Sequence, residues 1–225
     1  MRGIFIAGTD TGVGKSVVTG FLAKYLRAKG YKVVTQKWVQ TGSRVCADIN
    51  LHLRIMGLSK SGIKNYLKHI CPYVFKLPAS PHLAAKAENK KIDISRIKKS
   101  FKLLASKFDF VIVEGVGGAL VPLSQKRLVI DIATELGLPA LVVAQNKLGA
   151  INHALMTIEA LKQRKMKILG ILFSNCQGQN KLVLKDNPDI VRKITGEKIL
   201  GVLPRNNNIK SLYKKFLPIA RKIIL

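Results

Sequence analysis

The chain has 225 residues, and its 39 Lys and Arg against 12 Asp and Glu give a formal net charge of +27. This length suits one α/β domain, so we expect residues 1–225 to form a single unit. No apolar run approaches the ~20 residues that a membrane span needs, and no N-terminal signal is visible. We therefore expect a cytoplasmic protein with no membrane partner.

The strong positive charge by itself suggests a nucleic-acid partner. The basic residues, however, are spread over helix faces. Within residues 93–107, for example, Ile94, Ile97, Phe101 and Leu104 form one apolar stripe, and the lysines fall largely outside it. The sequence has neither an aromatic-interleaved basic motif nor zinc-finger spacing, so we expect no physiological nucleic-acid partner.

Three cysteines, Cys46, Cys71 and Cys176, are scattered along the chain. An odd, unclustered set is typical of reduced thiols in a cytoplasm. We therefore expect neither a disulfide framework nor a zinc site.

The first predicted elements are a strand over 2–7 and a helix over 15–29, joined by the loop GTDTGVGKS at 8–16. Glycines let the backbone wrap closely around phosphate oxygens, and the unpaired N–H groups that open the helix point at the anion. Lys15 adds a positive charge, and the Ser16 hydroxyl can coordinate Mg²⁺. The usual pattern has one residue fewer between its glycines, which leaves an incidental glycine-rich turn as the alternative. The strand–loop–helix context favours a site for a nucleoside triphosphate and a divalent metal.

Strands and helices alternate along the rest of the chain. Further strands are predicted over 32–37, 110–113, 140–144, 168–173 and 199–203, and further helices over 47–56, 82–88, 93–107, 150–165, 188–195 and 210–224. Asn187 is expected to cap the helix at 188–195, with Pro188 in its first turn. Continuous apolar strands separated by helices predict a single-domain α/β fold, with a mostly parallel sheet and helices on both faces, like that of P-loop NTPases.

Ligands of such sheets bind at the carboxyl ends of the strands. Four segments stand there: the loop 8–16, KWVQTG at 37–42, EGVGG at 114–118, and Asn175. Because these strand ends meet at one edge of the sheet, we expect the four segments to build a common site.

Three side chains at these ends suit phosphate chemistry. Glu114 can hold Mg²⁺ or its waters, or it is a strand-terminal acid that faces water. Asp48 begins a helical segment, so a metal ligand and a plain N-cap both remain open. Lys37 can neutralise charge on a reacting phosphoryl or carboxylate group.

The segment LGAINH at 148–153 opens a helix. The free N–H groups of Gly149, Ala150 and Ile151, together with the Asn152 amide, predict a carboxylate site. Ordinary helix capping explains the same residues equally well.

Taken together, these segments resemble the dethiobiotin synthetase family. The resemblance covers most of the chain, and the extra residue in the loop 8–16 is the family's own form. It continues in order through KWVQTG (37–42), CPY (71–73), ASPH (79–82), VEGVGG (113–118), VPL (121–123), KLGAINHA (147–154) and GVLP (201–204).

The resemblance implies an ATP-dependent reaction of 7,8-diaminopelargonate with CO₂. An amine is carboxylated to a carbamate, the γ-phosphate of ATP activates the carbamate as a carbamic-phosphoric anhydride, and the second amine closes the ring. The products are dethiobiotin, ADP and phosphate. The implied cofactor set is ATP, as substrate, with Mg²⁺.

The resemblance also implies residue roles. Lys37, Lys15 and Thr11 would be catalytic, and Thr41 would help to position the diamine and carbamate. The family is a homodimer in which Gly149, Ala150, Ile151 and Asn152 of one subunit receive the substrate carboxylate bound by the other. Mg²⁺ would be held by Ser16, Asp48 and Glu114. The implied nucleotide-binding residues are Gly12, Val13, Gly14, Lys15, Ser16, Val17, Asp48, Glu114, Gly115, Val116, Gly117, Asn175, Cys176, Pro204, Arg205 and Asn206.

The sequence departs from the family at three places. Trp38 replaces a proline beside Lys37, Cys176 replaces a frequent acid, and residues 205–210 lack an acid that some members use near the ribose. A partition-type ATPase that binds DNA through a basic surface is the alternative. Those proteins carry an extra lysine early in the loop, where this chain has Asp10.

Overall fold

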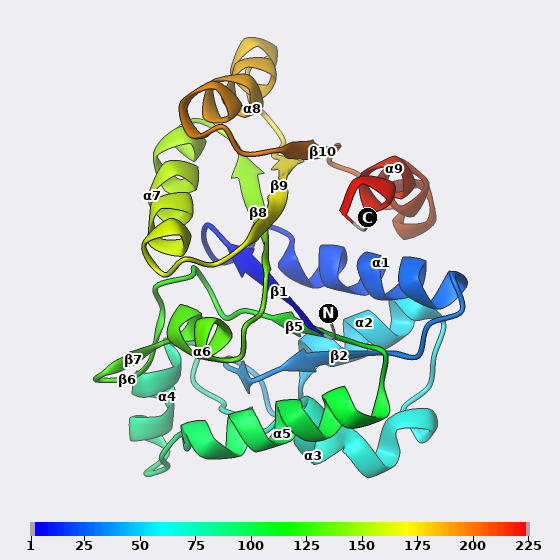
Figure 1. The fold of residues 1–225 in the computed structure, drawn as a ribbon, viewed down its shortest axis with the longest axis vertical. Coiled ribbons are helices and arrows are strands. Elements are labelled where there is room, and N and C mark those ends of the chain that lie inside the picture. The colour runs from blue at the N-terminus through cyan, green and yellow to red at the C-terminus, as the bar shows by residue number, and fades with distance from the viewer. Residues whose placement is uncertain (1–2, 224–225) are drawn as a thin grey trace.

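The computed structural model describes residues 3–223. In this range, six parallel strands form the central sheet in the order β10-β9-β8-β1-β5-β2. The strands are β1 (Gly3–Gly8), β2 (Val33–Lys37), β5 (Phe110–Glu114), β8 (Ala140–Asn146), β9 (Ile168–Asn175) and β10 (Ile199–Leu203). The predicted parallel α/β sheet is therefore confirmed (Figure 1).

Helices cover both faces of the sheet, because successive side chains of a strand point to opposite sides. Along β1, Ile4 and Ile6 pack into a core with α1 and α9, whereas Phe5 and Ala7 pack into a core with α5, α6 and α7 (Figure 1). The helices are α1 (Lys15–Ala28), α2 (Ala47–Met56), α3 (Leu67–Ile70), α4 (Pro81–Ala87), α5 (Ile94–Lys107), α6 (Val129–Glu135), α7 (Ala150–Gln163), α8 (Lys181–Thr195) and α9 (Ile209–Ile223). Residue 2 of the first predicted strand and residue 224 of the last predicted helix lie outside the described residues.

Helix α8 begins earlier than the sequence predicts. Its N-cap is Asn180, whose side chain accepts a hydrogen bond from the Leu182 N–H at 2.8 Å. Pro188 lies inside the helix and cannot donate to the Leu184 carbonyl, but Asn146 Nδ2 donates to that oxygen at 2.8 Å. The prediction of Asn187 as the cap is wrong, because its buried amide bonds Asn146 instead.

Several short elements were not predicted. β3 (Val39–Gln40) pairs with β4 (Tyr73–Val74), and β6 (Pro122–Ser124) pairs with β7 (Arg127–Leu128). A short 3-10 helix, η1, spans Ser61–Tyr66. Elements this short carry too little periodicity to be recognised in a sequence.

Cys46 and Cys71 form a disulfide, with their Cα atoms 6.5 Å apart. The prediction of reduced thiols is therefore wrong for this pair, and Cys176 is the free cysteine of the described chain. The two residues are 25 positions apart in sequence. Pairing of β3 with β4 brings their segments together, which spacing alone did not reveal.

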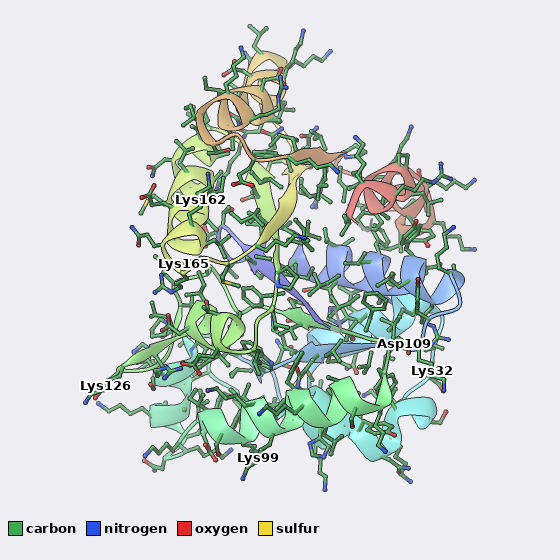
Figure 2. All side chains as sticks on the ribbon, viewed as in Figure 1. Lys32, Lys99, Asp109, Lys126, Lys162 and Lys165 are labelled. Carbon is green, nitrogen blue, oxygen red and sulfur yellow. A yellow bond between two sulfur atoms is a disulfide. The ribbon has the colours of Figure 1, made fainter. Side chains whose placement is uncertain are left out.

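The basic side chains are distributed around the molecule. Figure 2 places Lys32, Lys99, Lys126 and Lys162 at separate parts of its outline. Lys99 and Lys162 lie on helices, as predicted, whereas Lys32 and Lys126 lie in connecting segments. No helix among residues 3–223 has both the length and the apolar character required to cross a membrane.

Candidate active site

The loop between β1 and α1 builds an anion site from main-chain groups. Gly14 adopts φ 101°, a left-handed conformation that L side chains rarely reach, and it turns the chain into the helix. Within the described residues, no side chain caps the first turn of α1, so its N–H groups remain available to a ligand. The residues that begin this turn, Lys15, Ser16 and Val17, line the adjacent cavity. Such a terminus favours a phosphate.

Lys15 lies in the same loop with its ammonium held close to the backbone. Its Nζ donates to the Asp10 carbonyl at 2.7 Å. Burial, and next the positive charge of Lys37, lower the pKa of Lys15 to about 8, against the opposing effect of Glu114. An anionic ligand would stabilise this poorly solvated charge.

Lys37 and Glu114 are neighbours because β2 and β5 pair in register at these two residues. Lys37 Nζ lies 2.8 Å from Glu114 Oε1 and 2.8 Å from Asp48 Oδ2, and it donates to the Gly115 carbonyl at 2.8 Å. Asp48 comes from the first turn of α2. The strand pairing and the helix together surround one buried ammonium with three oxygens.

Ser16 joins the same cluster from α1. Its Oγ lies 2.9 Å from Glu114 Oε1 and 3.1 Å from Asp48 Oδ1. The N-cap of α2 is Cys46, and the Asp48 carboxylate bonds Lys37 and Ser16, so the plain-cap alternative for Asp48 is wrong. Glu114 is buried with its carboxylate paired, which also excludes the alternative of an acid facing water.

Electrostatics keeps the cluster charged. Burial alone would raise the pKa of Glu114, but Lys37 and His52 beside it outweigh burial and hold that pKa well below its ordinary value. Burial would likewise lower the pKa of Lys37, but the Glu114 and Asp48 carboxylates raise it. Lys37 is therefore an ammonium and Glu114 a carboxylate at neutral pH.

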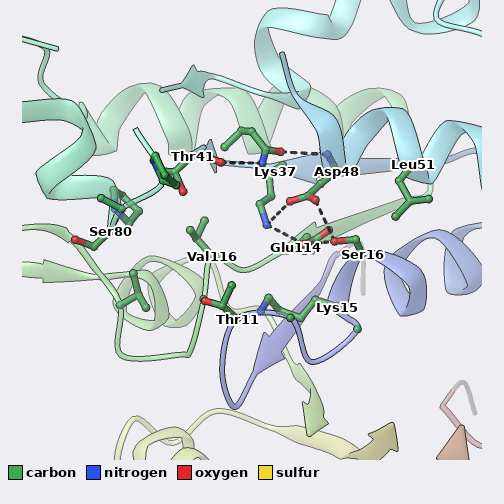
Figure 3. Close-up of a pocket in the computed structure, with 18 of the residues that line it drawn as sticks. Thr11, Lys15, Ser16, Lys37, Thr41, Asp48, Leu51, Ser80, Glu114 and Val116 are labelled. Carbon is green, nitrogen blue, oxygen red and sulfur yellow. Dashed lines mark hydrogen bonds and ion pairs between the residues drawn. The ribbon is translucent and has the colours of Figure 1, made fainter. Parts of the chain in front are cut away.

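These groups open into one cavity of about 720 Å³. In Figure 3, Thr11 and Lys15 of the loop face Lys37, Thr41 and Asp48 across the cavity, with Glu114 between them. The predicted site residues that line it are Thr11, Gly12, Gly14, Lys15, Ser16, Val17, Lys37, Thr41, Asp48, Glu114, Val116 and Gly117. Val13 of the loop is buried, and Gly115 contributes its carbonyl to Lys37.

The oxygen atoms around Ser16 suit a divalent cation. Ser16 Oγ, Asp48 Oδ1 and Glu114 Oε1 converge at the edge of the phosphate loop. Hydroxyl and carboxylate oxygens beside a phosphate site are the ligands that Mg²⁺ takes. No group of three or more His, Cys, Asp and Glu able to hold a metal occurs in residues 3–223, so a phosphate or water would complete such a site.

Comparison with known proteins decides which phosphate-loop family this is. A family profile described as an AAA domain matches residues 2–211. ATP-dependent dethiobiotin synthetase BioD 2 of Haemophilus influenzae is 40% identical over 183 residues, 81% of this chain and 95% of the relative. The BioD synthetase of Anaeromyxobacter dehalogenans is 38% identical over 204 residues, 91% and 90% of the two chains. This chain belongs to the dethiobiotin synthetase family. It is an ATP-binding enzyme, a ligase of biotin biosynthesis.

Solved structures agree on the fold of this synthetase-family chain. The ParA family ATPase from Chlorobium tepidum superposes with a TM-score of 0.58 at 18% identity, covering 98% of this chain and 92% of that one. Cell division ATPase MinD of Pyrococcus furiosus gives 0.59 at 19% identity, covering 99% and 98%. At these identities the likeness shows the P-loop fold alone.

The residues that the family resemblance assigns to the substrate carboxylate lie elsewhere. Gly149, Ile151 and Asn152 line a second cavity of about 660 Å³, which shares no lining residue with the first. Ala150 is buried behind them. Gly149 caps α7 with φ 84°, and no side chain of the described residues caps this turn.

The last five of the implied nucleotide-binding residues do not line the first cavity. Asn175 and Cys176 follow β9, and Pro204, Arg205 and Asn206 follow β10, which pairs with β9. They therefore lie at the same edge of the sheet as the loop. Asn175 Oδ1 accepts a hydrogen bond from Asn146 Nδ2 at 2.9 Å.

Trp38, where the synthetase family usually has proline, points into the core. It is buried, stacks on Phe5 with ring centroids 6.0 Å apart, and donates to Gln36 Oε1 at 3.0 Å. Lys37 and Thr41 on either side still face the cavity. The substitution leaves this loop of the synthetase-family site open to a ligand.

Sequence reasoning missed three polar residues of the site. Gln40 Oε1 accepts the Asp48 N–H at 3.1 Å, and Ser80 lines the cavity within the family-like segment 79–82. His52 contacts Glu114 from α2. The one available signal for His52 was its position four residues after Asp48, on the same helix face.

Proposed function

We propose that this chain catalyses the ATP-dependent carboxylation and ring closure of 7,8-diaminopelargonate with CO₂, giving dethiobiotin, ADP and phosphate, in the cytoplasm. The observation that carries the proposal is that the phosphate loop and the Lys37 cluster open into one cavity. A nucleotide phosphate and a second anion can therefore meet beside Lys37 and Lys15.

The proposed reaction has three steps. One amine of the substrate attacks CO₂ and loses a proton, which gives a carbamate. A carbamate oxygen then attacks the γ-phosphorus of ATP, ADP leaves, and a carbamic-phosphoric anhydride forms. The second amine attacks the carbonyl carbon of this anhydride and loses a proton, phosphate leaves, and the cyclic urea closes.

The side chains supply positioning and charge neutralisation, which is what phosphoryl transfer requires. Lys15 and the first turn of α1 would hold the β- and γ-phosphates. Lys37 would neutralise the carbamate and the transferring phosphoryl group. Thr11 and Thr41, on opposite walls of the cavity, would position the diamine and carbamate.

Two further sets of residues complete the proposal. Ser16, Asp48 and Glu114 would hold Mg²⁺, which supplies charge neutralisation at the phosphates when it is bound. Asn175 would contact the adenine edge. Its neighbour Cys176 and the segment of Pro204, Arg205 and Asn206 would lie beside the base. The position of these residues at the same sheet edge as the loop supports this assignment.

We also propose a homodimer with shared sites. The carboxylate site at 149–152 is separate from the Lys37 cavity of its own chain, so a partner would have to present it. Leu148 and Leu182, 80% and 76% exposed, line that second cavity. An apolar rim of this kind favours burial against a second copy.

The test is an assay of ADP and product with diaminopelargonate, bicarbonate, ATP and Mg²⁺. We expect ADP release that depends on the diamine and yields dethiobiotin. ATP hydrolysis that DNA stimulates, and that ignores the diamine, would overturn the proposal in favour of a partition-type ATPase.

Subunit mixing tests the shared sites. A Lys37→Ala homodimer and an Asn152→Ala homodimer should each be weakly active when the diamine is kept well below its KM. After mixing with subunit exchange, about a quarter of all sites regain both residues in a random C₂ assembly. If the subunits exchange and the mixture regains no activity, the shared site is rejected, whereas the proposed reaction is not.

A further inference from the structure

His52 is a buried polar residue that the reaction above does not use. It lies on α2, one turn after Asp48, and its side chain is 0% exposed. Its Nε2 is 2.7 Å from Glu114 Oε2. The helix that carries Asp48 therefore also contacts Glu114 on strand β5.

The contact has a defined direction. A carboxylate only accepts hydrogen bonds, so His52 Nε2 carries the proton and donates it. Among the described residues, no group bonds His52 Nδ1, which is buried. The hydrogen bond to Glu114 is therefore the one polar contact that the ring makes among the described residues.

The two carboxylate oxygens of Glu114 have different partners. Oε2 accepts from His52, whereas Oε1 faces Ser16 Oγ at 2.9 Å and Lys37 Nζ at 2.8 Å. Turning the carboxylate out of this plane would break the His52 bond and leave a buried oxygen without a donor. The histidine therefore holds the orientation in which one oxygen faces the cavity.

We propose that His52 is a positioning residue that fixes the Glu114 carboxylate for a divalent cation at the Ser16, Asp48 and Glu114 oxygens. The inference rests on the proposed metal site. Outer-sphere partners of this kind set the orientation and basicity of metal-binding carboxylates. Because His52 and Asp48 share one helix face, His52 also keeps the two carboxylates at a constant separation.

The experiment measures metal binding directly. Mn²⁺ is titrated into the full chain with a non-hydrolysable ATP analogue, and free Mn²⁺ is followed by electron paramagnetic resonance. Binding of the analogue in EDTA is measured separately, so that metal affinity and nucleotide affinity are distinguished. Thermal unfolding reports the stability of each variant.

We expect His52→Leu to weaken Mn²⁺ binding by about 10- to 100-fold, as loss of an outer-sphere partner does elsewhere. Analogue binding in EDTA should stay near wild type. His52→Gln, whose amide nitrogen can reach the same carboxylate oxygen, should restore most of the Mn²⁺ affinity, whereas the shorter His52→Asn should not. Leu53→Ala, a buried change on the same helix that lines a different cavity, is the control for lost stability.

The outcomes separate the possibilities. If His52→Leu does not fold, the comparison of His52→Gln with His52→Asn decides, and equal Mn²⁺ affinities overturn the proposal. Wild-type Mn²⁺ affinity in a folded His52→Leu, or equal losses in His52→Leu and Leu53→Ala, also overturns it. Unchanged Mn²⁺ binding in Glu114→Gln would instead reject the metal site on which the inference rests.

Discussion

Replacing Lys37 with methionine separates the catalytic role of this charge from its structural role. The residue is 4% exposed, and its ammonium contacts Asp48 Oδ2, Glu114 Oε1 and the Gly115 carbonyl, each at 2.8 Å. Methionine keeps most of the volume and removes the charge. The two carboxylates then face each other with Ser16 and His52 as their remaining donors.

Two free energies follow from this geometry. Removing one member of a buried ion pair costs about 3–5 kcal/mol of stability, and the remaining donors place Lys37→Met near the lower limit. Loss of a donor that stabilises developing charge lowers kcat by roughly 10²–10³-fold. Chemical denaturation measures the first effect, and steady-state assays at saturating substrates measure the second.

The double variant Lys37→Met with Glu114→Gln is the matched control. It removes both charges of the pair, so it should regain part of the lost stability. Its kcat should remain at least as low as that of Lys37→Met. If Lys37→Met kept kcat near wild type, or if the double variant recovered turnover together with stability, Lys37 would be structural and the mechanism would be wrong.

Three further predictions follow from the site and its surroundings. The pKa of Lys15 is about 8, and a phosphate binds the ammonium form, so affinity for an ATP analogue in EDTA should fall from pH 7 to 9.5, approaching about tenfold per unit above pH 8. Lys15→Arg stays charged, so its affinity for the analogue, measured by fluorescence titration, should not fall over this pH range. An affinity of the wild-type protein that is constant with pH would contradict the lowered pKa of Lys15. Asn152→Ala should raise KM for the diamine about tenfold, as loss of a hydrogen bond to a charged group does, with little change in KM for ATP. Equal effects on both KM values would remove Asn152 from the carboxylate site. Joint replacement of Cys46 and Cys71 by serine should lower the free energy of unfolding by about 3 kcal/mol without reductant and not at all with excess dithiothreitol. Equal stability of both proteins without reductant would show that the pair is not bonded.

Local patterns account for the features that could be predicted. The strand before Gly8 and the helix after it are continuous apolar and periodic segments, and the glycines of the loop are demanded by backbone geometry. Helix α8 shows where such reasoning fails. Asn187 and Pro188 have the composition of a helix start, but they lie inside α8. Pro188 leaves the Leu184 carbonyl without its usual helical donor, and Asn146 at the end of strand β8 donates to that carbonyl instead. A tertiary contact therefore overrode a sound local signal.

The disulfide was missed for a related reason. Cys46 and Cys71 lie 25 residues apart, and the β3–β4 pair that joins their segments has only two residues in each strand. A pairing this short leaves no recognisable pattern in sequence. The prediction of free thiols rested on the odd number and scattered positions of the cysteines. Neither of these shows which cysteines the folded chain brings together.

The sequence alone determined the phosphate loop and the order of the six central strands along the chain, because each depends on residues within a few positions of one another. It also carried the family resemblance that places this chain among the dethiobiotin synthetases. Only the tertiary structure decided that Ser16, Lys37 and His52 share the Glu114 carboxylate, since they lie 98, 77 and 62 residues from it. Their meeting depends on strand order, on the register that sets Lys37 opposite Glu114, and on the packing of α2 beside them.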